Sequence, residues 1–191
     1  MRFDHPAHQI VLQDFIHAVE DAESRRDRLT RQIEELMPSW SMAPVAAALQ
    51  AMRGIALVAA VMVVAEVDDF RRFTNPRQLM AYLGLVPSEH SSRSTTRWHY
   101  QGRQCACASR PDRVRLDPRM SARVSRKLYD RLEPLSAAIR DIAWKAQVRL
   151  CPRYRRLAAI GKPKIVVTTA IAREMVGFIW AIAPIAQPEI I

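Results

Sequence analysis

The residues of this sequence with the clearest capacity for chemistry are arginines and lysines that occur in short groups. Their guanidinium and ammonium groups can hold phosphate oxygens through charge-assisted hydrogen bonds. A single exposed arginine is more often plain surface, so the argument depends on the grouping. The positions that we expect to contact the phosphates of a nucleic acid are Arg53, Gly54, Arg71, Arg72, Arg153, Arg155, Arg156, Lys162 and Lys164.

The overall charge favours a polyanionic partner. The 191 residues include 29 Lys and Arg against 19 Asp and Glu, which gives a formal net charge of +10. Nucleic acid is the leading candidate for such a partner. Composition alone leaves open the alternative that the charge serves only solubility.

Metal and disulfide chemistry are not predicted. Cys105, Cys107 and Cys151 are an odd number and form no CxxC pair, so neither a disulfide framework nor a zinc site follows. The acidic residues fall in charged helical flanks or near the end of an apolar helix, and no strand aligns carboxylates for paired metal ions. We therefore assign no metal ligand and no cofactor to this chain, and a reducing cytoplasm fits its cysteine usage.

No segment is predicted to cross a membrane or to direct secretion. The apolar run 55–65 is too short for a bilayer, which needs about 20 residues. The stretch 165–183 carries Arg173 and Glu174 in its middle, which favours a buried helix. The polar opening MRFDHPAHQ is unlike a secretory signal. We expect a cytoplasmic protein.

A helical hairpin is predicted to position the first basic group. Residues 44–73 read as an alanine-rich helix, a break at Arg53-Gly54, and an apolar helix that ends at Asp68-Asp69. This pattern resembles a helix-hairpin-helix, in which backbone N–H groups of the turn hold a DNA phosphate. The usual second small turn glycine is replaced by Ala56, and a plain helical hairpin in the core stays open as the alternative.

A coiled-coil helix is predicted for residues 1–37. Apolar or small residues recur there at alternating three- and four-residue steps, with Arg26 in the one polar slot. The intervening positions are densely charged, as in EDAESRRDRLTRQIEE, which suits a solvated flank. A single amphipathic helix packed on its own domain is the alternative. The predicted seam consists of Leu12, Phe15, Val19, Ala22, Leu29, Ile33 and Leu36.

The remaining chain also reads as helix. Asn75-Pro76 begins one helix that Gly84 ends, 124–157 has helical spacing with many arginines opposite its apolar face, and 165–183 follows a short turn. Almost nothing reads as strand. We predict a mainly α protein, with the coiled-coil helix at 1–37, a helical domain containing the helix-hairpin-helix at 38–184, and a tail at 185–191.

Several segments together resemble the transposases of the insertion sequence 110 type, which are related to the Piv invertase. They are the hairpin around Arg53-Gly54, the stretch FRRFTNPRQLMAYLGLVPSEHSS from Phe70, and GKPKIVVTTAIAREMVGFIWAIA from Gly161. The most specific element is YLGLVPSEHSS. The resemblance implies a two-part enzyme in which an amino-terminal RuvC-like domain holds Mg²⁺ with four acidic residues, and a coiled coil and a helical domain with a serine nucleophile follow.

The resemblance places the nucleophile at Ser92, with Ser91 as a neighbouring possibility. Arg93 stands where the family has glycine, a change that removes backbone freedom beside the serine. A serine hydroxyl needs a base or a metal to become a good nucleophile, and here that help would come from the acidic domain. Since only the carboxy-terminal parts of the family pattern are recognised, we expect this chain to be a truncated transposase that is inactive alone.

Segment 97–119 departs from the family although both flanks match it. Plausible codons for 99–118, read one nucleotide later, spell ITKAGNAHVRRVLIESAWT, which resembles the family segment. We therefore predict that this stretch is disrupted by a local change of reading frame. The alternative is a genuine basic insertion that contacts phosphate.

The predicted function is DNA binding and DNA transposition or site-specific recombination, with DNA, and through the family a guide RNA, as partners. A homo-oligomer, or pairing of the coiled coil with a full-length transposase, is expected. The alternatives are a non-catalytic DNA-binding or dimerisation partner of an intact transposase, and a general helix-hairpin-helix DNA-binding protein.

Overall fold

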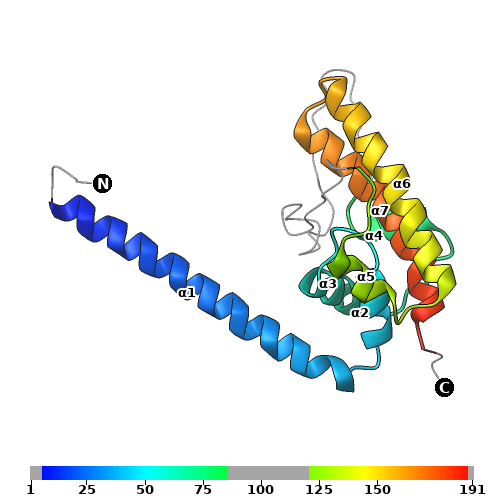
Figure 1. The fold of residues 1–191 in the computed structure, drawn as a ribbon, viewed down its shortest axis with the longest axis horizontal. Coiled ribbons are helices and arrows are strands. Elements are labelled where there is room, and N and C mark those ends of the chain that lie inside the picture. The colour runs from blue at the N-terminus through cyan, green and yellow to red at the C-terminus, as the bar shows by residue number, and fades with distance from the viewer. Residues whose placement is uncertain (1–5, 86–120, 189–191) are drawn as a thin grey trace. The chain divides into compact units, whose positions relative to one another are not determined.

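The computed structural model describes residues 6–85 and 121–188, and within these ranges all the regular structure is helical (Figure 1). The predicted mainly α fold class is therefore confirmed. The elements in chain order are α1 (Pro6–Leu36), the 3-10 turn η1 (Met37–Ser39), α2 (Ala43–Leu49), α3 (Leu57–Val67), α4 (Pro76–Tyr82), α5 (Arg126–Leu132), α6 (Ala137–Ala159) and α7 (Lys164–Ala186).

The chain divides into two compact units, Met1–Trp40 and Ser41–Ile191. The first contains α1 and η1, and the second contains the other six helices that the structure describes. Each unit is considered by itself below.

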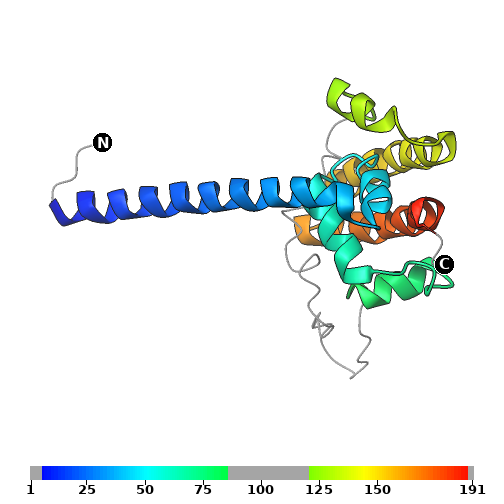
Figure 2. The same ribbon diagram turned by 90° about the horizontal axis from the view of Figure 1, so that it is seen from below.

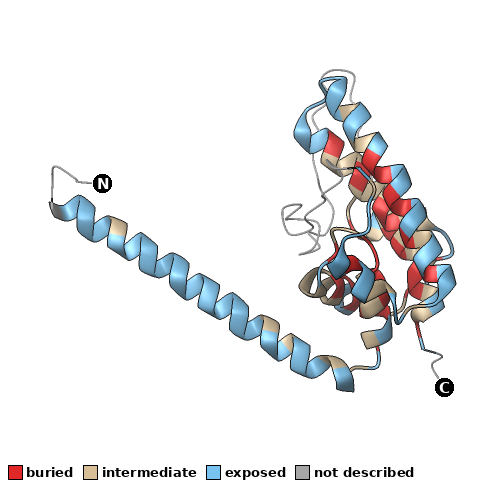
Figure 3. Cartoon of the chain, in the orientation of Figure 1, coloured by how far each residue is buried: buried red, intermediate tan, exposed pale blue. Residues whose placement is uncertain are grey.

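Helix α1 is 31 residues long and none of residues 7–36 is buried (Figure 3). Its predicted seam includes the exposed side chains of Phe15, Val19, Leu29 and Leu36. A helix stripe of this kind is normally covered by another apolar surface. The pattern of the seam is thus present on the helix, whereas a coiled-coil partner for it stays a prediction.

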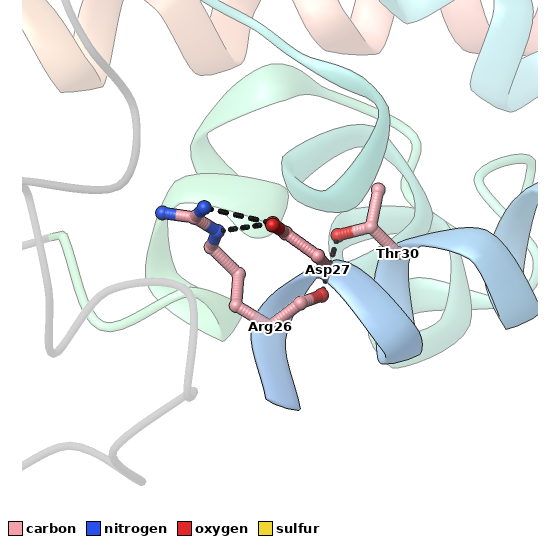
Figure 4. Close-up of polar contacts among 3 residues, drawn as sticks. All are labelled: Arg26, Asp27 and Thr30. Atoms are coloured by element: carbon pink, nitrogen blue, oxygen red, sulfur yellow. Dashed lines mark hydrogen bonds and ion pairs between the residues drawn. The ribbon is translucent and has the colours of Figure 1, made fainter. Parts of the chain in front are cut away.

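Arg26, the polar residue of the seam, is partnered on its own helix (Figure 4). Its Nε atom donates to Oδ1 of Asp27 over 2.8 Å, and Oγ1 of Thr30 donates to the Arg26 carbonyl oxygen over 2.9 Å. The hydrogen bond and the negative charge of Asp27 raise the pKa of the Arg26 guanidinium above its ordinary value. The positive charge that Arg26 places in the seam is therefore paired with the carboxylate of Asp27 on the same helix.

Local signals explain where the helices of the second unit begin and end. Pro44 is in the first turn of α2, where a missing N–H is harmless. Asn75 caps α4 by accepting from the backbone N–H of Gln78 over 3.1 Å, and Gly84, with φ 70°, follows the end of that helix. Both ends of α4 lie where the sequence predicts them.

The core of the second unit forms around α7, which packs against α2, α4 and α6. Figures 1 and 2 both show α6 and α7 side by side. Ile171 and Ile182 of α7 are fully buried with Leu49, Phe70 and Leu79 of the preceding segments. By length and composition α7 could also cross a bilayer, but its inward face is used by this core, in keeping with the predicted buried helix.

The single helix predicted over 124–157 is wrong, because the structure has two helices there. Helix α5 ends at Leu132, and α6 starts at Ala137 after Ser136, whose side chain accepts from the Ile139 backbone N–H over 3.5 Å. Pro134 lies between them. It has no N–H to donate and its ring clashes with the preceding turn, so it interrupts the helix despite the continuous apolar spacing.

Helix α7 runs past the predicted end at 183, through Pro184 to Ala186, and the residue after it ties the unit together. The side chain of Gln187 donates to Oδ1 of Asp69 over 2.7 Å and accepts from the backbone N–H of Phe70 over 3.2 Å. Gln187 is itself buried. This C-terminal latch therefore joins the end of α7 to the segment between α3 and α4.

Candidate nucleic-acid interface

The turn between α2 and α3 has the geometry that its sequence demands. Helix α2 ends at Leu49, Gly54 takes φ 96°, and Ala56 in extended conformation precedes α3. Residues with a Cβ rarely adopt such a positive φ, so glycine suits this position. The structure has two helices with a glycine turn between them, as the sequence predicts. A helix-hairpin-helix that binds DNA stays a prediction.

A pocket of about 250 Å³ opens beside this turn. It is lined by Met52, Arg53, Gly54, Arg123, Ser125, Lys127, Leu128 and Arg131. Four of these eight side chains are cationic and none is acidic. The pocket therefore concentrates positive charge around a glycine turn, which is the arrangement expected for an anion.

Two segments far apart in the sequence meet at the pocket. Nη1 of Arg53 donates to the carbonyl oxygen of Ser121 over 3.0 Å, which links the hairpin turn to the segment before α5. On α5, Ser125 caps the helix by accepting from the backbone N–H of Leu128 over 3.4 Å. These contacts hold the lead-in to α5 beside the turn.

Three cations of the pocket, Arg123, Lys127 and Arg131, are absent from the phosphate-contact set predicted from sequence. Lys127 and Arg131 are four residues apart and so lie on one side of α5, whereas Arg123 lies in the segment before that helix. The sequence analysis noted many arginines in this region but had no means to place them beside Arg53. Only the fold brings together positions about seventy residues apart along the chain.

Arg71 and Arg72, both predicted to contact phosphate, are used within the protein. Nη2 of Arg71 donates to the carbonyl oxygen of Gln187 over 2.8 Å, at the carbonyl end of α7, where a positive charge is favourable. The Arg72 guanidinium lies 4.7 Å from the ring centroid of Phe73 and 4.6 Å from that of Tyr82. Both side chains thus have structural contacts that a phosphate would have to compete with or share.

The predicted residues of α6 and α7 separate into two groups. Arg153, together with Arg149, forms an ion pair with the largely buried Glu174 of α7, where the Arg149 Nε to Oε2 distance is 2.8 Å. These ion pairs link α6 to α7. Four other predicted residues are exposed where these helices meet: Arg155 and Arg156 near the end of α6, Lys162 in the turn, and Lys164 at the start of α7.

Other predicted positions fall elsewhere. Ser92, Ser91, Arg93 and segment 97–119 lie outside the described residues. Within the described ranges, no group of three or more His, Cys, Asp or Glu side chains could hold a metal ion, and Cys151 is buried in α6.

Two comparisons with known proteins bear on the family of this chain. The sequence profile of the Transposase IS116/IS110/IS902 family matches residues 46–109. A protein of Sinorhizobium fredii (strain NBRC 101917 / NGR234), provisionally named transposase y4qE, is 48% identical over 189 residues that cover 95% of this chain. Both matches support a relationship of this chain to the IS116/IS110/IS902 transposases.

The extent of these matches bears on the candidate interface. The match to the family profile includes Arg53, Gly54 and Ser92, and it ends inside segment 97–119. The chain spans 44% of the length of the Sinorhizobium relative. No solved structure gives a significant match.

Proposed function

We propose that this chain binds duplex DNA as part of an insertion-sequence transposase, and that the pocket at the α2–α3 turn holds a backbone phosphate. The observation that carries the proposal is the convergence of Arg53, Arg123, Lys127 and Arg131 on the Gly54 turn, with no acidic residue among the described residues of the lining. The relationship to these transposases makes DNA the expected polyanion.

The electrostatics of the pocket support this role. Mutually repelling cations gathered in one hollow are stabilised by an anion, and the first N–H groups of α3 have no partner within that helix. A phosphate at the turn would receive hydrogen bonds from the guanidinium groups and from the backbone. Such a contact fixes the position of DNA without reading its sequence.

The test is DNA affinity as a function of salt. Fluorescence anisotropy with a fluorescein-labelled duplex of random sequence measures the slope of log affinity against log salt concentration, which changes by about 0.9 for each phosphate contact. The double variant Lys127→Ala/Arg131→Ala removes two of the four cations proposed to hold this one phosphate, so we expect the slope to fall by about 1.

The matched control is Arg126→Ala/Lys145→Ala, which removes the same charge from exposed positions of α5 and α6 outside the pocket. Equal effects of the two double variants would overturn the pocket as a phosphate site. A labelled single-stranded RNA is the second probe, and tighter binding of RNA than of duplex by the wild type would replace DNA by RNA as the partner.

The proposed catalytic role of Ser92 is that its oxygen attacks a DNA phosphorus, loses its proton, and displaces a sugar oxygen that takes up a proton. Mg²⁺ and acidic residues of a RuvC-like domain would activate the serine, so this chain is proposed to be inactive without that domain. The readout is a covalent DNA–protein adduct, formed with Mg²⁺ and full-length relative present. Ser92→Ala should abolish the adduct of this chain and Ser91→Ala should not, whereas an adduct that survives Ser92→Ala contradicts the role.

A second candidate function is favoured by the exposed seam of α1: a non-catalytic partner that pairs with an intact transposase through a coiled coil. The double variant Phe15→Glu/Ile33→Glu places charges in the seam and should abolish co-purification with the full-length relative. The control Gln13→Glu/Ser24→Glu adds the same charge at positions outside the heptad seam. Loss of pairing in both double variants, or in neither, would contradict a specific coiled coil.

A further inference from the structure

The hairpin between α6 and α7 is strongly basic. From residue 142 to residue 173 the chain has no Asp or Glu, and its cations are Lys145, Arg149, Arg153, Arg155, Arg156, Lys162, Lys164 and Arg173. Glu174 forms ion pairs with both Arg149 and Arg153, so its single negative charge offsets one of these two positive charges. Arg155, Arg156, Lys162 and Lys164 are exposed, and within the described ranges none of these four is paired with an acidic side chain.

The same turn also exposes large aliphatic side chains. The exposed fractions of Ile160, Ile165 and Val166 are 64%, 70% and 46%. Isolated exposed apolar residues need no explanation, but here three of them lie within seven positions that also contain two lysines. We call residues 155–166 the α6–α7 tip.

The backbone of the tip is closed by a defined cap. Gly161, with φ 77°, follows α6; its N–H donates to the Ala158 carbonyl over 3.0 Å, and the Lys162 N–H donates to the Leu157 carbonyl over 3.3 Å. This pairing of bonds satisfies the last carbonyls of a helix. Pro163 then precedes α7, so Ile160 at the end of α6 and Ile165 in the first turn of α7 lie on either side of a short turn.

The tip stands clear of the pocket described above. In Figure 1 the α6–α7 turn is at one end of the second unit and the α2–α3 hairpin is toward the other end. A Cβ atom built on Gly161 would meet no other atom within 4 Å. The backbone at Gly161 is therefore open on the side where a side chain would stand.

We infer that the α6–α7 tip is a second DNA contact, in which Ile160 and Ile165 wedge against base steps while Arg155, Arg156, Lys162 and Lys164 hold the flanking phosphates. Apolar side chains used in this way partly unstack base pairs and bend the duplex, and cations beside them offset the phosphate charge. This inference rests on the proposed function in that DNA is the partner, and it assigns to the tip a distortion of the duplex.

The experiment uses the full chain and a short duplex that carries 2-aminopurine, whose fluorescence rises when a base unstacks, and donor and acceptor dyes at its ends. Wild-type protein should raise the fluorescence and shorten the end-to-end distance. The variant Ile160→Ser/Ile165→Ser should lose most of both signals while the salt slope of binding stays unchanged. Lys162→Ala/Lys164→Ala should lower that slope by about 2.

The matched control is Val148→Ser/Ile185→Ser, which removes two exposed aliphatic side chains elsewhere on α6 and α7 and should leave unstacking intact. Binding without any unstacking by the wild type, or unstacking that survives Ile160→Ser/Ile165→Ser, overturns the wedge but leaves the pocket in place. No DNA binding at all overturns both. Binding of the wild type to phosphatidylserine vesicles in preference to the duplex would make the tip a lipid contact and overturn the wedge.

Discussion

Helix α1 and the second unit use apolar residues in opposite ways. On α1 the side chains of Phe15, Val19 and Leu29 repeat at coiled-coil spacing yet remain exposed, whereas Phe70 and Ile171 of the second unit are fully buried. A helix with an uncovered apolar stripe gains little from burial. The second unit is therefore expected to be stable by itself, and α1 to gain stability only from a partner.

The largest expected effect on the free energy of unfolding tests whether the second unit is stable by itself. Phe70→Ala removes a fully buried ring and should lower the free energy of unfolding by about 3–5 kcal/mol. Phe15→Ala on α1 removes a ring that is 65% exposed and should change it by less than about 0.5 kcal/mol in dilute protein. Chemical denaturation followed by circular dichroism measures both, and a comparable loss in the two variants would abolish the contrast.

An intermediate loss of stability is expected when the C-terminal latch of the second unit is removed. Gln187→Ala leaves the backbone N–H of Phe70 buried without its acceptor, which should lower stability by about 1–3 kcal/mol. Gln32→Ala on the exposed α1 is the control and should have almost no effect. A Gln187→Ala protein as stable as wild type would mean that α7 is held without this latch.

The latch also predicts a pH dependence. The Gln187 side chain, and next the backbone N–H of Arg71, hold the pKa of Asp69 below its ordinary value of 3.8. A lowered carboxyl pKa stabilises the fold above the unfolded value and loses that effect as pH falls through the folded value. The stability difference between wild type and Gln187→Ala should therefore shrink below about pH 3.8, measured by denaturation at a series of pH values.

The smallest expected effect concerns ion pairs. Glu174→Gln removes the counter-charge of Arg149 and Arg153 across α6 and α7 and should lower stability by about 1 kcal/mol, because Glu174 is largely buried. Asp130→Asn breaks the exposed pair with Arg126 on α5 and should change it by less than about 0.5 kcal/mol. Thermal melting distinguishes them, and equal shifts would mean that burial of Glu174 adds nothing.

Much of the helical framework could be predicted because its signals are local. Asn75-Pro76 caps and starts α4, Gly84 ends it, and Gly54 supplies the turn between α2 and α3. The separation of α5 from α6 at Pro134 was also readable in principle, but the apolar periodicity across it masked the break. Element boundaries are decided by single residues, which a periodic pattern averages over.

Composition and short-range pattern determined that the chain is basic, mainly helical and similar to a known transposase family. Tertiary structure decided which cations act together: it placed Arg123, Lys127 and Arg131 around the Gly54 turn and assigned Arg71, Arg72 and Arg153 to internal contacts. The physical reason is the distance along the chain over which each kind of interaction acts. Helix caps and turns depend on neighbours within a few residues, whereas an electrostatic pocket depends on distances in space between segments that are far apart in the chain.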